Sequence, residues 1–280
     1  LDYLMHAVLR PCRRCGQAMV IGLLAALPAG VCAEAAAPHL DAWLGAGVTG
    51  FDYEEFDRGA SLDREEGVLP GITAGLRFVR HTLFAESTLD AASGRADYRA
   101  AGVATRTDED LVDWDAVAGR EFSGRGGNRI SLYAGLGHRR WRRDIRSTAT
   151  ASGLDETYRW WYGILGLRGA RGLGEHARVR ADLQLTRTLD PSVRVRFAAG
   201  YDDITLDPGE ERGVRAAVTF ENRIDNGLVV FVSPWFEYWE LGRSTDAVLT
   251  QKGLPAGTVF EPRSETRNLG IHAGVRWRLF

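Results

Sequence analysis

Apolar and polar side chains alternate along ten segments of this chain, and a two-residue period is that of a β-strand. The segments are 40–56, 68–80, 82–92, 110–122, 129–144, 156–169, 177–186, 213–222, 228–241 and 268–280. In the last segment, one face carries Leu269, Ile271, Ala273, Val275, Trp277 and Leu279, and the other carries Gly270, His272, Gly274, Arg276 and Arg278. No segment with a helical period competes with these, so the pattern predicts an all-β fold.

The connections between these segments alternate in length. Short connections span 79–82, 123–128, 171–176 and 225–227, and the last of them reads Asp-Asn-Gly, which favours a type I′ hairpin turn. Long polar connections span 57–67, 93–109, 145–155, 189–212 and 243–266. Short turns on one side and long loops on the other are typical of transmembrane β-barrels. The segment 193–201 alternates again, so it either extends the seventh strand or adds strands and raises the count to twelve.

The first 33 residues have the three parts of a secretory signal peptide. Arg10, Arg13 and Arg14 precede an apolar run over 18–27, and small residues follow at a cleavage position after Ala33. The apolar run is too short to span a bilayer as a helix. We therefore expect residues 1–33 to be removed after export and residues 34–280 to form one barrel domain.

Composition argues against several classes of function. All three cysteines, Cys12, Cys15 and Cys32, lie in the leader, so we expect neither disulfides nor a thiolate metal site in the mature chain. The leader holds three Arg and one Asp, so its removal changes the formal charge from −2 to −4, which argues against a nucleic-acid partner. No calcium-loop spacing is present, and we expect no cofactor and no metal.

The alternation, the connections and the leader together resemble those of small bacterial outer-membrane β-barrel proteins, and the omptin proteases are similar in size and strand count. The resemblance implies a monomeric, antiparallel up-and-down barrel of ten strands in the outer membrane. It also implies outer-membrane lipid, lipopolysaccharide and the barrel assembly machinery as partners. In this family the last strand carries a C-terminal assembly signal, here Trp277, Leu279 and Phe280, with Phe280 one residue out of phase with the lipid-facing residues.

Charged residues mark the face opposite the apolar stripe. An arginine that faces lipid at mid-bilayer costs about 2–4 kcal/mol, so we expect these side chains to line the lumen. Ten strands enclose a lumen only slightly wider than one that side chains fill, and opposite charges there should pair across strands. The expected lumen charges are Arg77, Glu86, Asp90, Asp113, Asp115, Arg178, Arg180, Asp182, Arg215, Glu221, Glu237, Arg276 and Arg278. A largely plugged lumen is the favoured interpretation, and an ion or solute path is the alternative.

Arginines and aromatic residues gather near the predicted strand ends. We expect Arg139, Arg140, Arg142 and Arg143, at the outward end of the fifth strand, to contact lipopolysaccharide, because guanidinium groups bind phosphate well. Interfacial girdles are expected to account for most of the aromatic residues, among them Phe51, Tyr53, Trp141, Tyr158, Trp160 and Trp239.

The sequence offers no catalytic set. Omptin proteases need Asp pairs and an Asp–His pair at the external rim, and Asp202-Asp203 has no Asp-x-His partner nearby. Ser131 and His138 share a strand, but the residues between them separate their side chains by roughly 20 Å. We therefore predict a non-enzymatic barrel that acts in envelope structure or surface interaction through its extracellular loops. A narrow ion or small-solute channel is the first alternative, and an outer-membrane protease or lipid A-modifying enzyme is the second.

Overall fold

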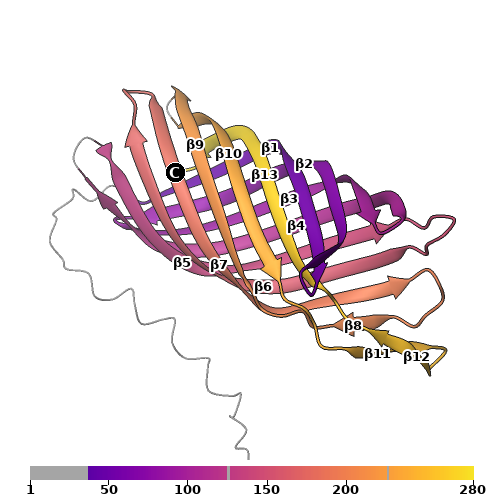
Figure 1. Cartoon of the computed structure of the whole chain (residues 1–280). Helices are drawn as coiled ribbons and strands as arrows, with labels where there is room; N and C mark the ends of the chain where they lie inside the picture. The colour runs from indigo at the N-terminus through magenta and orange to yellow at the C-terminus, as the bar shows by residue number, and fades with distance from the viewer. Residues whose placement is uncertain (1–36, 125–126, 226) are drawn as a thin grey trace, which may run out of the picture. The chain divides into compact units, whose positions relative to one another are not determined.

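The computed structural model describes residues 37–124, 127–225 and 227–280, which form an antiparallel β-barrel (Figure 1). The expected leader over 1–33 and Asn226 of the expected hairpin turn lie outside these residues. The strands are β1 (His39–Asp57), β2 (Ala60–Arg80), β3 (Leu83–Ala100), β4 (Val103–Ser123), β5 (Arg129–Ile145), β6 (Leu154–Gly172), β7 (Ala177–Phe197), β8 (Ile204–Leu206), β9 (Arg212–Asp225), β10 (Leu228–Leu241), β11 (Ala247–Gln251), β12 (Leu254–Val259) and β13 (Arg263–Arg278). Among the described residues, no helix has the length and hydropathy to cross a membrane.

Ten long strands make the barrel wall. They follow chain order from β1 to β7 and then through β9, β10 and β13, and β13 pairs with β1 to close the ring. This arrangement confirms the predicted ten-stranded up-and-down barrel. The twelve-stranded alternative is wrong, because β8 pairs only with the end of β7, and β11 and β12 form a separate hairpin.

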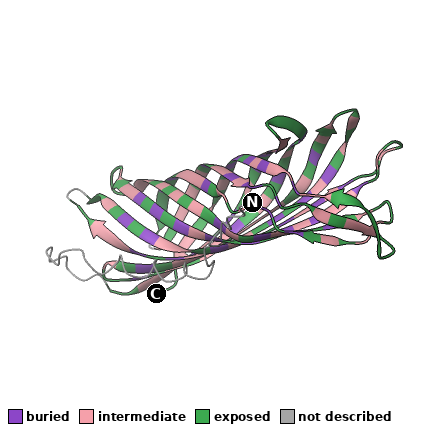
Figure 2. Cartoon of the chain, turned by 60° about the horizontal axis from the view of Figure 1, so that its bottom comes forward, coloured by how far each residue is buried: buried purple, intermediate pink, exposed green. Residues whose placement is uncertain are grey.

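Burial alternates along the wall strands, as Figure 2 shows. Large apolar side chains on the outer face form a belt that is exposed on every wall strand, and its members include Leu44, Ile72, Leu89, Val112, Leu132, Leu165, Leu183, Phe220, Val232 and Ile271. Charged side chains lie on the inner face instead. Because this distribution is the reverse of that in a soluble protein, the belt needs lipid around it.

The strands continue beyond the belt on the side away from the chain ends. Turns of two residues, at Arg58-Gly59 and at Ala101-Gly102, connect β1 to β2 and β3 to β4. The expected long loops over 57–67 and 93–109 are therefore wrong. Outward positions there are charged and pair across strands, as Arg64 does with Asp52, so both faces of the sheet are polar and the alternation is lost. We call this part the extracellular extension; it comprises residues 51–66, 95–109, 140–159, 190–212 and 239–267.

The seventh strand also reaches into the extracellular extension. It passes through Asp190, which has a φ of 45°, and its register against β6 shifts between Arg159 and Trp161. The alternating segment beyond Pro191 therefore extends the seventh strand, which was one of the two expected alternatives.

Candidate functional site

The inner face of the barrel is the candidate functional site, because charged side chains from all ten wall strands meet there. The structure brings the expected lumen charges to this face. Most of them lie deep in the barrel, whereas Arg278 lies at the mouth near the chain ends, where it is half exposed and pairs with Asp41 at 3.3 Å. In the orientation of outer-membrane barrels this mouth faces the periplasm.

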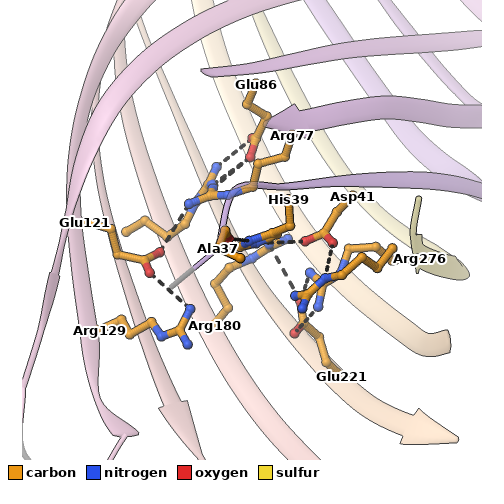
Figure 3. A network of polar contacts seen from close by, with 12 residues as sticks. Ala37, His39, Asp41, Arg77, Glu86, Glu121, Arg129, Arg180, Glu221 and Arg276 are labelled. Atoms are coloured by element: carbon orange, nitrogen blue, oxygen red, sulfur yellow. Dashed lines mark hydrogen bonds and ion pairs between the residues drawn. The ribbon is translucent and has the colours of Figure 1, made fainter. Parts of the chain in front are cut away.

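Ion pairs fill the periplasmic end of the lumen (Figure 3). Glu86 accepts two hydrogen bonds of 2.9 Å from Arg168 and one from Arg77, which also reaches Glu121 at 3.2 Å. Glu221 accepts a bidentate pair from Arg276, at 2.8 and 2.9 Å. The periplasmic layer, as we call it, has six arginines and four carboxylates: Arg77, Arg129, Arg168, Arg178, Arg180, Arg276, Glu86, Glu121, Asp182 and Glu221.

A second group of charges lies deeper in the barrel and has the opposite balance. Arg139 bridges Asp113 and Glu237, the latter at 2.8 Å, and Arg215 donates to Asp90 at 3.1 Å. Tyr162 donates to Asp115 at 2.5 Å. The middle layer therefore has four carboxylates and two arginines: Asp90, Asp113, Asp115, Glu237, Arg139 and Arg215.

Residues of both layers line a cavity of about 140 Å³. Neutral polar side chains complete its wall, namely Thr73, Thr88, Gln184, Thr219 and Ser233. Trp43 and Phe231 add apolar surface to it.

Aromatic side chains crowd the lumen at the base of the extracellular extension, next to the middle layer. Trp141 is fully buried, stacks on Tyr158 with ring centroids 4.6 Å apart and meets Trp239 edge-on at 5.5 Å. Arg139 lies over the Trp239 ring, and Arg143 lies over the Trp141 ring. We call these rings the aromatic seal: Phe51, Tyr53, Trp141, Tyr158, Trp160 and Trp239. Their expected place in interfacial girdles is wrong, because they all lie on the inner face.

Beyond the seal, one arginine is surrounded by carboxylates. Arg143 is 0 % exposed and donates to Glu55, Glu65 and Glu156, each at 2.9 Å. It also contacts the hydroxyl groups of Tyr53 and Tyr158, at 3.2 and 3.3 Å. Asp63, Glu109 and Glu261 are buried nearby, so the Arg143 cluster has six carboxylates: Glu55, Asp63, Glu65, Glu109, Glu156 and Glu261.

So many buried carboxyl groups cannot all ionise beside a single cation. Burial raises the pKa of Asp63 to about 8, with repulsion from Glu55 adding to it, and burial raises the pKa of Glu156 to about 7. Burial and repulsion from Glu65 raise the pKa of Glu109 well above its usual range. Burial would also raise the pKa of Glu65, but the attraction of Arg143 and a hydrogen bond with Glu109 lower it. Of these two carboxyl groups, Glu109 therefore holds a proton more readily than Glu65.

The residues expected to contact lipopolysaccharide point in two directions. Arg139 and Arg143 are buried in the barrel, so their expected contact with lipid phosphates is wrong. Arg142 points outward but is paired with Asp155 at 2.7 Å. Arg140 is exposed and lies opposite Arg159 of β6, which is also exposed. Neither of these two arginines makes an ion pair with a described residue. The expectation based on one strand missed Arg159, because only the β5–β6 register brings the two together.

Two aromatic residues lie on the outer face, on the periplasmic side of these arginines. Trp114 and Trp161 are exposed, with ring centroids 6.2 Å apart, and His138 packs against Trp161 at 5.0 Å. This cluster has the position of an interfacial girdle at the outer edge of the belt.

The expected C-terminal assembly signal lies at the barrel seam. The amide of Leu40 donates to the carbonyl of Phe280 at 3.1 Å, and that of Leu279 donates to Leu40 at 2.8 Å. The side chains of Leu279 and Phe280 are exposed, and Trp277 is half-buried. Their recognition by the assembly machinery stays a prediction. Among the described residues, no group of three or more His, Cys, Asp or Glu side chains is arranged to hold a metal ion.

Of the comparisons with known proteins, only the one with solved structures found similar chains. No family model and no curated protein matches the chain. Among solved structures, the barrel is similar to the outer membrane protease OmpT from Escherichia coli, with a TM-score of 0.61 and 13% identity over 86% of this chain and 96% of that one. The translocator domain of the autotransporter NalP from Neisseria meningitidis has a TM-score of 0.44 and 13% identity over 85% and 88%. The outer membrane protein OprG from Pseudomonas aeruginosa has a TM-score of 0.45 and 7% identity over 87% and 96%.

At 13% identity, the likeness to OmpT concerns the fold, which both chains share over most of their length. The apolar belt, the charged interior and the ring of ten strands supply the same conclusion from the chain itself. The chain thus has the fold of a small outer-membrane β-barrel, with an apolar belt that fits a lipid bilayer.

Proposed function

We propose that this protein is a closed outer-membrane barrel that serves in envelope structure or surface interaction through its extracellular extension. The observation that carries the proposal is the closed lumen. Trp141, Tyr158 and Arg143 are fully buried, which supports a cross-section filled by side chains at this level. A layer filled in this way would leave water and ions no continuous path.

The extracellular extension supports a role in surface interaction, because its backbone is a regular sheet and its outer face is charged. Arg146 and Asp108 form a bidentate pair there, with distances of 2.7 to 3.1 Å. The β11–β12 hairpin is held by Asp202, which accepts hydrogen bonds from Thr250 and from the amides of Lys252 and Gly253. Val248 and Leu254 of this hairpin are exposed and give it an apolar contact surface.

We expect purified protein to give no steady conductance in planar bilayers, because the aromatic seal blocks the lumen. Protein that migrates differently before and after boiling would show that the tested sample is a folded barrel. Steady conductance whose ion selectivity reverses in the Arg180→Glu variant would contradict the closed barrel and support the channel. Arg180 suits this test because it lies on the periplasmic side of the seal.

We also expect the barrel to bind lipopolysaccharide through Arg140 and Arg159. Replacing either with glutamine should weaken binding about fivefold, since an exposed charge contact contributes up to about 1 kcal/mol. The loss should shrink at high salt, because exposed charges are screened beyond about 8 Å at physiological strength. Co-purified lipopolysaccharide measured by mass spectrometry is the readout. Arg64→Gln is the matched control, since carboxylates of Asp52 and Glu66 already pair with that outward arginine. Equal losses in all three variants would contradict a specific site.

We propose no enzymatic activity, although OmpT is a protease. Of the described histidines, His39, His81 and His176 lie at the periplasmic end, His138 on the lipid-facing side and His272 in the lumen. None of these can act as a base beside the carboxylates of the extracellular extension. Cleaved peptides or deacylated lipid A in membranes that contain the protein, lost on substitution of His138 or Asp203, would overturn this part of the proposal.

A further inference from the structure

We propose that the lumen cavity binds a small zwitterion from the periplasm, a solute with a carboxylate at one end and an ammonium group at the other, such as a free amino acid. The proposal goes beyond the surface role and rests on three features of the lumen: opposed charge layers, charged groups with a buried atom that makes no hydrogen bond, and a single open end.

The cavity lies between layers of opposite net charge. Six arginines face four carboxylates in the periplasmic layer, and four carboxylates face two arginines in the middle layer. A simple anion would be attracted by the first layer and repelled by the second, and a simple cation would meet the reverse. A zwitterion aligned along the lumen is attracted by both layers.

Each layer offers the cavity a charged group that the barrel leaves unsatisfied. Arg180 reaches Glu221 only at 3.6 Å, its Nε is buried without a partner, and it makes no hydrogen bond with another described residue. Asp90 accepts from Arg215 through Oδ2, whereas its Oδ1 is buried without a partner. Both side chains line the cavity. Charged groups whose hydrogen bonds are incomplete are costly in a low-dielectric interior, so a ligand that adds hydrogen bonds to both is stabilised.

The chemistry of the two groups fixes the orientation of the ligand. A guanidinium matches a carboxylate with parallel hydrogen bonds, so the ligand carboxylate belongs at Arg180. An ammonium group donates three hydrogen bonds, so it belongs at Asp90, with Asp115 of the same layer as a second acceptor. Hydroxyl groups of Thr219 and Ser233 lie in the wall, where they can bond the polar parts of the ligand.

Size and access restrict the ligand further. A buried water needs about 10–15 Å³ of cavity volume. The cavity of about 140 Å³ therefore admits a solute of a few heavy atoms and excludes a peptide. The aromatic seal closes the outer side. Exposure of the arginine side chains rises toward the periplasmic mouth, from 8% at Arg168 and 19% at Arg276 to 43% at Arg129 and 56% at Arg278, the last two of which stand at strand ends. The ligand therefore enters from the periplasmic side.

Calorimetric titration of the purified full barrel in detergent tests the proposal, with glycine and L-serine as probes and acetate and methylammonium as half-ligands. We expect an amino acid to saturate one site with a dissociation constant at or below about 1 mM, and neither half-ligand to bind at the same concentration. Arg180→Gln and Asp90→Asn should each weaken binding at least tenfold, and Arg180→Lys should restore part of it.

Two further variants separate loss of binding from loss of folding. Ala217→Leu fills the cavity without changing any charge and should abolish binding, while Arg64→Gln on the outer face should leave it unchanged. Each variant is first checked for the migration shift of a folded barrel. Binding of acetate or methylammonium as tightly as the amino acid would overturn the proposal, and so would no binding at all, since the cavity would then hold only water.

Discussion

Replacing Arg143 with methionine is expected to unfold the extracellular extension while the part of the barrel inside the belt stays folded. The side chain is 0 % exposed and is the cation that Glu55, Glu65 and Glu156 share. Removing one partner of a buried ion pair typically costs 3–5 kcal/mol, because the remaining charge is left unpaired. Limited proteolysis of the extension and hydrogen exchange in β1, β2 and β5 would measure the local loss of structure.

Arg142→Met is the matched control for this substitution. Arg142 is the preceding residue of the same strand, but it points outward and pairs with Asp155 at 39% side-chain exposure. An exposed pair contributes at most about 1 kcal/mol, so this variant should behave like the original protein. If the extension resisted proteolysis and hydrogen exchange equally well in the two variants, Arg143 would not be the residue that holds the carboxylates together.

Raising the pH from 6 to 9 is expected to lower the thermal stability of the barrel. The pKa of Asp63 is raised by burial to about 8 and that of Glu156 to about 7, so both groups are largely protonated at pH 6 in the folded state and ionised in the unfolded one. The folded state then binds more protons, and its stability falls as the pH rises from about 4 to about 8. With about 1.4 kcal/mol for each unit of pKa difference, the two groups together lose about 2–4 kcal/mol, or on the order of 5–10 °C in apparent Tm.

The temperature at which the folded band is lost on unboiled gels, measured at pH 6, 7, 8 and 9, checks this expectation. In the Asp63→Asn variant this temperature should fall less between pH 6 and pH 9, because the amide cannot ionise. Asp52→Asn serves as the control, since Asp52 lies on the outer face of the same extension and pairs with Arg64. An apparent Tm that rises toward pH 9 would show that these carboxyl groups are not protonated in the folded barrel.

Alternation was enough to predict the barrel because lipid and lumen impose opposite demands on successive residues. That demand stops at the edge of the belt. In the extension, Arg64 outside and Glu65 inside are both charged, so the residues lose the pattern that marks a strand, and 57–67 looked like a loop. The length of the strands beyond the membrane could therefore not be predicted from the period alone.

The candidate site was predictable in part. Placing charges opposite the apolar stripe correctly grouped residues such as Glu86 and Arg276, but the same rule applied to β5 would have turned Arg139 and Arg143 inward with Ser131 and Tyr133. As a local run in the sequence, the arginines predict a surface contact, and only the strand alternation separates the inward from the outward ones. Which charges meet could not be predicted, because Arg168 and Glu86 are 82 residues apart and come together only through barrel closure.

The seam between β1 and β13 has a consequence for the rate of folding. It joins Asp41 to Arg278 across 237 residues, so its contacts are the least local in the barrel. Contacts of such sequence separation form late and slow a folding reaction, because the entropy of closing the chain must be lost first. Until that step, β1 and β13 both present unpaired backbone edges to other chains. The nascent barrel is thus most prone to aggregation immediately before closure, and the speed with which the last strand meets the first determines how much of it survives.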